Sequence, residues 1–233
     1  MIETFIPERA LAVYAHPDDP EVSCGGTLAR WAASGADVRL VIANRGEKGS
    51  SDPATDPDAL AAHRAEEVVT AAAVLGIAGV EHLGYPDGEI DNDASLRERL
   101  VELIRRHRPD ALVAPDPTAV FFGDTYVNHR DHRQLGWAVL DSLVPAASPL
   151  YLPEAGPVHQ VSLVLLSGTL AANAWIDVAD VLDRKIAAVA CHASRVGDHP
   201  ELVAELLEHR AAEEGQRSGL AHAEAFRRLR LGA

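Results

Sequence analysis

Two short clusters of histidine and aspartate have the residue types and spacing to hold a metal ion. The first, "HPDD", places His16 three residues before Asp19, directly after an apolar run. The second, "NHRDHR", spans residues 128–133 and carries two more histidines and another aspartate. Imidazole nitrogen and carboxylate oxygen are normal zinc ligands, and a catalytic zinc usually takes three protein ligands and keeps a position for water. Each cluster alone is ordinary loop chemistry, but together they predict one shared metal site.

The apolar pattern predicts alternating strands and helices that position these clusters. Strands are predicted at 10–15, 37–44, 80–83, 110–116, 161–166 and 174–178. Helices are predicted at 25–35, 58–75, 95–108, 131–143, 180–193 and 200–230. This alternation favours right-handed crossovers, and therefore an α/β, Rossmann-like fold whose mainly parallel sheet has helices on both faces. With 233 residues, the chain is expected to form a single domain over 1–233.

The predicted active site lies at the carboxyl ends of the strands, where open α/β sheets bind their ligands. The long polar loops of the chain leave those ends, and both clusters lie in them. Asp131 is expected near the start of a helix, where a carboxylate is favoured by capping and by the helix dipole.

Composition argues against several other classes of protein. With 21 basic and 35 acidic residues, the formal charge is -14, so a nucleic-acid partner is disfavoured. The most apolar segment, 161–176, is interrupted by Gly168 and Asn173 and is too polar for a membrane span. The N-terminus lacks the features of a signal peptide, and Cys24 and Cys191 show no metal-binding spacing. A cytoplasmic location is therefore expected.

Six motifs resemble, in order, those of the PIG-L/LmbE-like family of zinc-dependent N-deacetylases, which hydrolyse the acetamide of N-acetylglucosamine-containing molecules. They span residues 10 to about 195 and read "AHPDDPE" with "CGGTLA", "RGEKGS", "HRAEE", "LGYPDG", "NHRDHR" and "CHASR". Two positions depart from the family pattern. Pro20 is inserted before Glu21, and Arg195 replaces a common glutamine.

The resemblance implies a role for each matching residue. Zinc would be held by His16, Asp19 and His132, although such a ligand set also accepts Fe²⁺. Asp18 would be the general base on a zinc-bound water. His129 would stabilise the oxyanion, with Asp131 or a neighbouring acid holding its tautomer or raising its pKa. Substrate binding would fall to Arg64 and Asp87, because a guanidinium and a carboxylate suit sugar hydroxyls.

Several alternatives stay open on sequence alone. The expected partner is a small amino-sugar substrate, but the chain also fits a catalytically silent sugar-binding or regulatory protein of the same fold. A metal phosphoesterase fits less well, because it usually needs more bridging carboxylates and basic phosphate clamps. Whether the chain forms a homo-oligomer is also undecided. The identity of the general acid, Asp18 or His129, is undecided, as are the roles of Glu21, Glu47, His192 and Arg195.

Overall fold

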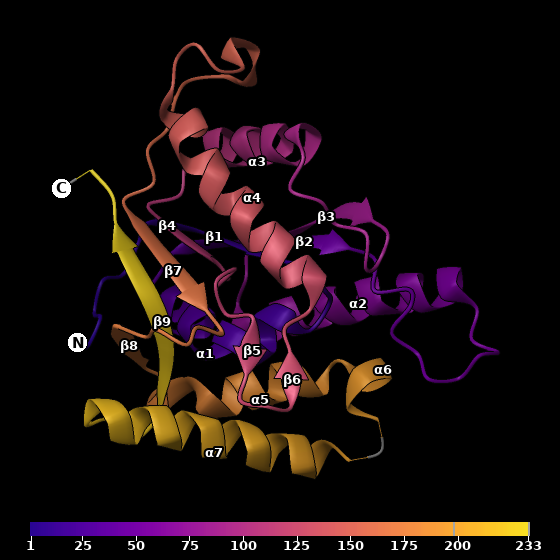
Figure 1. Cartoon of the computed structure of the whole chain (residues 1–233). Coiled ribbons are helices and arrows are strands. Elements are labelled where there is room, and N and C mark those ends of the chain that lie inside the picture. Colours follow the sequence, from indigo (N-terminus) through magenta and orange to yellow (C-terminus); the bar gives the residue numbers. More distant parts are fainter. Residues whose placement is uncertain (198, 233) are drawn as a thin grey trace.

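A seven-stranded sheet with helices on both faces forms the centre of the molecule (Figure 1). The computed structural model describes residues 1–197 and 199–232. The strands are β1 (Arg9–Tyr14), β2 (Asp37–Asn44), β3 (Gly79–Tyr85), β4 (Ala111–Pro115), β5 (Phe121–Phe122), β6 (Tyr126–Val127), β7 (Leu163–Ser167), β8 (Ala174–Asp177) and β9 (Ala223–Arg230). The helices are α1 (Asp19–Ala33), α2 (Pro57–Leu75), α3 (Ala94–His107), α4 (Arg130–Ala147), α5 (Leu182–Ala190), α6 (Ala193–Val196) and α7 (Pro200–Ser218), with short 3-10 turns η1 (Pro153–Ala155) and η2 (Ala179–Val181).

The strand order is β3-β2-β1-β4-β7-β9-β8, and the first five strands are parallel to one another. Side chains of β1 alternate between two cores. Ala12 and Tyr14 pack toward α1, α2 and α5, whereas Leu11 and Val13 pack toward α3 and α4. Burial on both faces explains why these strands are almost continuously apolar. The predicted α/β fold with a mainly parallel sheet is therefore confirmed.

The predicted helix over 200–230 is wrong in its second half. Helix α7 ends at Ser218, and Gly219 adopts a left-handed φ of 77° that closes it. Residues 223–230 form β9, which pairs antiparallel with both β7 and β8. The segment is rich in Ala and Arg, which favour helix, but strand pairing overrides that local preference. Its buried Glu224 accepts hydrogen bonds from the backbone of Gly26 and Thr27 and from Lys185.

Other boundaries also differ from expectation. Helix α1 begins at Asp19, six residues before the predicted start, and is interrupted at Cys24, whose φ of -147° is not helical. The loop after β4 contains an unexpected two-stranded hairpin, β5–β6. In Figure 1 this hairpin lies across from α5 and α7. Among the described helices, none combines the length and the apolar character needed to cross a membrane.

Gly136 controls how closely α4 approaches β4. A Cβ built at this position would lie 2.5 Å from the carbonyl oxygen of Pro115 and 2.9 Å from Pro117. Alanine normally stabilises a helix interior relative to glycine by ~1 kcal/mol. Here we expect Gly136→Ala to lower the free energy of unfolding by about 1–3 kcal/mol, because the backbone must move to relieve the clash. Urea denaturation measures this change, and an unchanged or higher midpoint would contradict it.

Candidate active site

The two clusters meet at the carboxyl end of the sheet. His16 lies in the turn between β1 and α1, Asp19 is the first residue of α1, and His132 lies in the first turn of α4. The Nδ1 atom of His16 is 3.0 Å from Nε2 of His132, and Oδ2 of Asp19 is 3.1 Å from each of these nitrogens. Side chains separated by 116 residues in the sequence thus form one compact triangle.

The opposite nitrogens of both histidines are held by oxygen acceptors. Nε2 of His16 is 3.2 Å from Oδ1 of Asp87. Nδ1 of His132 is 2.9 Å from Oδ1 of Asn128, whose amide nitrogen donates to the carbonyl of Ala119. If each histidine donates its proton to these acceptors, the two nitrogens inside the triangle carry lone pairs. Two lone pairs and a carboxylate would repel one another unless a cation lay among them.

The donor set therefore fits a divalent ion. Tetrahedral ligands about 2.0–2.1 Å from zinc lie about 3.3 Å apart, close to the separations in this triangle. Burial lowers the pKa of His16, but the carboxylates of Asp19 and Asp87 raise it to about 10. Burial raises the pKa of Asp19, but His132 and His16 bring it well below its usual range. A proton and a metal ion would thus compete for the same nitrogen.

Asp18 sits in a strained backbone conformation beside the triangle. Its φ of 92° is unusual for a residue other than glycine, and its side chain makes no capping hydrogen bond to α1. Its Oδ2 lies 3.4 Å from Nε of Arg195, on α6. Burial and the neighbouring Asp19 raise the pKa of Asp18 to about 6, against the opposing effect of His192 and Arg195. This carboxylate lines the pocket without belonging to the triangle.

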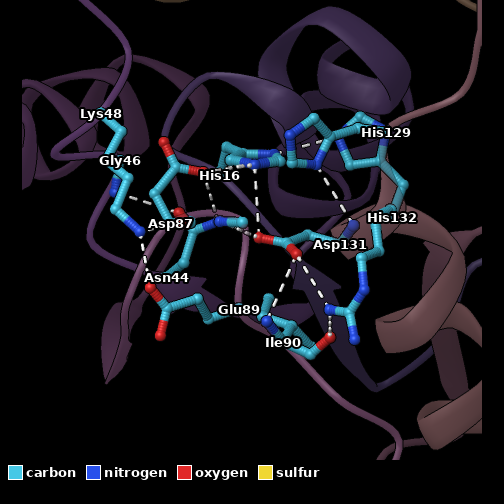
Figure 2. Close-up of polar contacts among 12 residues, drawn as sticks. His16, Asn44, Gly46, Lys48, Asp87, Glu89, Ile90, His129, Asp131 and His132 are labelled. Carbon is cyan, nitrogen blue, oxygen red and sulfur yellow. Dashed lines mark hydrogen bonds and ion pairs between the residues drawn. The ribbon is translucent and has the colours of Figure 1, made fainter.

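Asp131 is fully buried in the first turn of α4 and organises the floor of the site (Figure 2). Its carboxylate accepts hydrogen bonds from Nδ2 of Asn44 at 3.0 Å and from the backbone N–H groups of Gly88 and Ile90 at 2.8 and 3.3 Å. It also lies 3.7 Å from Nε2 of His16. Its expected place at a helix start is confirmed.

His129 is the N-cap residue of α4, and its ring packs edge-on against the ring of His16 with centroids 4.5 Å apart. Its Nδ1 accepts the backbone N–H of Asp131 at 3.2 Å. Nδ1 is thus unprotonated, and the proton of a neutral ring resides on Nε2. Burial, together with His16, lowers the pKa of His129 despite the carboxylate of Asp131. The backbone N–H of Asp131 thus holds the tautomer, and the pKa is lowered, whereas Asp131 or a neighbouring acid is expected from the sequence to hold the tautomer or to raise the pKa.

Arg64 and Asp87 line the same pocket, whose volume is about 300 Å³. Arg64 is buried on α2, donates to the carbonyl of Gly46 at 3.0 Å, and packs closely against Gly49. Asp87 contacts His16 directly, and its backbone N–H donates to Glu47 at 3.0 Å. Asp87 therefore has an orienting contact that the sequence interpretation did not assign to it.

The residues of undecided role fall into two groups. Glu47 anchors the backbone of Asp87, and Arg195 reaches the rim of the pocket. His192 and Glu21 are fully buried, with Nε2 of His192 3.3 Å from Oε2 of Glu21. Burial lowers the pKa of His192, but Glu21 and Asp18 raise it above its usual value. This pair ties the start of α1 to the residue before α6.

Sequence reasoning missed Asn44 and Asn128 as site residues. Asn128 is the first letter of "NHRDHR", four residues before His132, which is the spacing of neighbours on a helix face. Asn44 ends β2 and so lies at the carboxyl edge of the sheet, but nothing in its local sequence distinguishes it from a turn residue.

Asn128 offers a direct test of the histidine geometry. We expect Asn128→Ala to weaken divalent-metal binding by about 10–100-fold, because His132 loses the acceptor that orients it. Asn128→Asp loses the same amide donor to Ala119 but keeps an oxygen for His132, so it should bind metal more tightly than the alanine variant. Zinc titration calorimetry measures both. Equal affinities in the two variants would refute the orienting role.

Comparisons with known proteins agree with this geometry. Residues 11–143 match the family profile described as PIG-L, GlcNAc-PI de-N-acetylase. A diacetylchitobiose deacetylase of Thermococcus kodakarensis is 30% identical over 228 residues, covering 94% of this chain and 82% of that enzyme. A 1D-myo-inositol 2-acetamido-2-deoxy-alpha-D-glucopyranoside deacetylase 2 of Saccharopolyspora erythraea is 36% identical over 178 residues, covering 66% of this chain and 63% of that enzyme. The solved N,N'-diacetylchitobiose deacetylase of Pyrococcus horikoshii, complexed with its inhibitor MPG, has a TM-score of 0.88 at 27% identity and covers 96% of this chain and 84% of its own.

Proposed function

This chain belongs to the PIG-L family of metal-dependent deacetylases, and from that premise we propose that it hydrolyses the N-acyl amide of an N-acetylglucosamine-containing small molecule or glycoside. The observation that carries the proposal is the triangle of His16, Asp19 and His132 with the separate carboxylate of Asp18 in one pocket. That combination supplies both a metal site and a base, which amide hydrolysis needs.

The metal is proposed to be zinc, held by His16, Asp19 and His132, with Fe²⁺ as the other ion that this ligand set accepts. When bound, the ion supplies Lewis acidity, which lowers the pKa of a coordinated water and polarises the amide carbonyl. Asp87 and Asn128 keep the two imidazoles oriented for it.

Asp18 is proposed as the general base that accepts a proton from the attacking water. A carboxylate whose pKa is raised to about 6 is a stronger base than an exposed aspartate and is still ionised at neutral pH. Asp18 then returns the proton to the leaving amine. His129 is less suited to that step, because its pKa is lowered and its ring is neutral near pH 7.

His129 is proposed to donate its Nε2–H to the oxygen on which negative charge develops. The backbone N–H of Asp131 occupies Nδ1, which leaves Nε2 as the donor without any change of tautomer. Asp131 is a positioning residue in this scheme, because its buried carboxylate contacts His16, Asn44 and the backbone and is not among the groups that line the pocket.

Arg64 and Asp87, which line the same pocket as the metal triangle, are proposed to bind the hydroxyl groups of the sugar. Arg64 uses one guanidinium nitrogen on Gly46, so further donors remain for a ligand. The expected partner is a small amino-sugar molecule in the cytoplasm, acted on by the single domain. The relatives named above, which act on diacetylchitobiose and on an inositol glycoside of acetamido-glucose, support this class of substrate.

The proposal is tested by metal analysis of the purified protein combined with a screen for acetate release. Diacetylchitobiose, N-acetylglucosamine and its inositol glycoside are the first substrates to examine. We expect acetate from at least one, and its loss after treatment with a chelator. Stoichiometric metal with no carboxylic acid released from any N-acylated sugar would contradict hydrolysis and favour a silent sugar-binding protein.

A further inference from the structure

A second, larger hollow of about 960 Å³ opens beside the metal triangle. One wall comes from the hairpin β5–β6, and the other from α5, α6 and α7. Figure 1 shows the hairpin facing these helices across the carboxyl end of the sheet. We call this hollow the acyl groove. The apolar side chains that line it include Val22, Phe122, Val189, Val196, Val203 and Leu206.

The acyl groove and the small pocket meet at the proposed base and two of the proposed metal ligands. The shared lining residues are Asp18, Asp19, Tyr126, His132 and Arg195. Arg64, Asp87 and His129, together with Lys48, line the small pocket alone. A molecule that occupies both the acyl groove and the small pocket must therefore extend across Asp18 and the metal ligands. The bond at that point is the one to be cleaved, so the two parts of the molecule lie on either side of the amide.

Polar groups on the floor of the acyl groove are already paired within the protein. The hydroxyls of Tyr14 and Ser167 are 2.7 Å apart, and Nζ of Lys185 is 2.6 Å from Glu224. Asp116 accepts from the hydroxyl of Thr169. A sugar placed on this floor would find these groups already engaged, and the polar side chains of Arg210 and Glu213 that also line the groove belong to its α7 wall; a hydrocarbon chain on the floor requires no partner.

We propose that the acyl groove receives the acyl chain of the substrate, and that this enzyme prefers amino sugars whose N-acyl group is longer and more apolar than acetyl. The inference rests on the proposed amide hydrolysis. The amino sugar then lies in the small polar pocket with Arg64 and Asp87, and the carbonyl lies at the metal ligands. The hydrocarbon chain extends between the hairpin and α7, past Leu206.

A chain-length series tests the proposal. The substrates are N-acetyl-, N-butyryl- and N-hexanoyl-glucosamine, together with the hexyl glycoside of N-acetylglucosamine. We expect kcat/KM to rise about fourfold per buried methylene, or roughly 200-fold from acetyl to hexanoyl. The hexyl glycoside should gain nothing, because its alkyl chain is attached on the sugar side of the amide.

Two leucines on α7 provide matched variants. Leu206 lines the acyl groove and is 47% exposed, whereas Leu202 is 57% exposed and lies outside it. Leu206→Asp should lower the hexanoyl-to-acetyl ratio of kcat/KM by at least about tenfold, because it replaces an apolar contact of the chain with a carboxylate that would have to lose water. Leu202→Asp should leave that ratio unchanged. Their similar exposure makes the fold equally tolerant of both changes.

Each remaining outcome is informative. Equal rates for acetyl and hexanoyl substrates overturn the proposal, and a gain confined to the hexyl glycoside assigns the groove to the aglycone instead. If Leu206→Asp changes the mass of the assembly in solution but not the hexanoyl-to-acetyl ratio, Leu206 lies in a contact between subunits, and this outcome also overturns the proposal. If no substrate is cleaved, the proposed hydrolysis fails. Calorimetry with hexanoate then tests separately whether the groove binds an acyl chain. Binding to the wild type that is lost in Leu206→Asp supports the proposal, and no binding to the wild type overturns it.

Discussion

Asp18→Asn should lower kcat by about 10³-fold while the purified protein keeps its metal. The substitution preserves the size of the side chain but removes a pocket carboxylate that lies outside the metal triangle and whose pKa is raised to about 6. His16, Asp19 and His132 are unchanged, so metal content should match the wild type. A loss of rate without a loss of metal thus distinguishes a general base from a metal ligand. They are measured by steady-state acetate release and elemental analysis.

The pH profile adds a second test of Asp18. A base must be unprotonated to act, so kcat/KM should fall as the pH decreases through the pKa of Asp18. That pKa is about 6 from burial and Asp19, and a bound cation would lower it further, so the acid limb lies at or below pH 6. Residual activity of Asp18→Asn should lack this limb. Asp183→Asn, an exposed carboxylate on α5, serves as the control and should keep both rate and profile. A rate for Asp18→Asn within tenfold of wild type would remove Asp18 from the role of base.

The site can be located from the sequence because the carboxyl ends of parallel strands lie at one edge of the sheet, and the loops that follow them meet there. His16 follows β1 and His132 follows the loop after β4, and these strands are neighbours in the sheet. Any fold that alternates strands and helices in this order brings both loops to the same end. The arrival of His16 and His132 at the same edge thus follows from the predicted topology, and the structure places their ring nitrogens 3.0 Å apart.

The details that sequence reasoning missed depend on contacts between distant segments. Asn44 reaches Asp131 across 87 residues, and the strand β9 exists because β7 and β8 accept it. The periodicity of a local segment does not show which distant residue or strand it will contact. Asp87 illustrates the same limit, because a Pro-Asp-Gly turn is ordinary until its carboxylate is seen against His16.

His132→Ala should lose both metal and activity, and the fall in kcat/KM should be on the order of 10⁴-fold or more. Removing one corner of the triangle leaves two ligands, fewer than a catalytic zinc usually takes from the protein. His129→Ala is the matched change, since it removes an imidazole from the same helix end and the same pocket but not from the triangle. It should keep its metal and lose about 10²–10³-fold in kcat, as expected for one oxyanion donor.

Zinc-dependent stabilisation distinguishes these two variants without relying on catalysis. A ligand that binds only the folded state raises the unfolding temperature as its concentration exceeds Kd. Added zinc should therefore raise Tm in the metal-free wild type and in His129→Ala, but not in His132→Ala at the same concentrations. The bound nitrogens must be free of protons, so the shift should shrink as the pH decreases. A full zinc-dependent shift in His132→Ala would mean that the ion is held elsewhere, and the assignment of His16, Asp19 and His132 as its ligands would have to be abandoned.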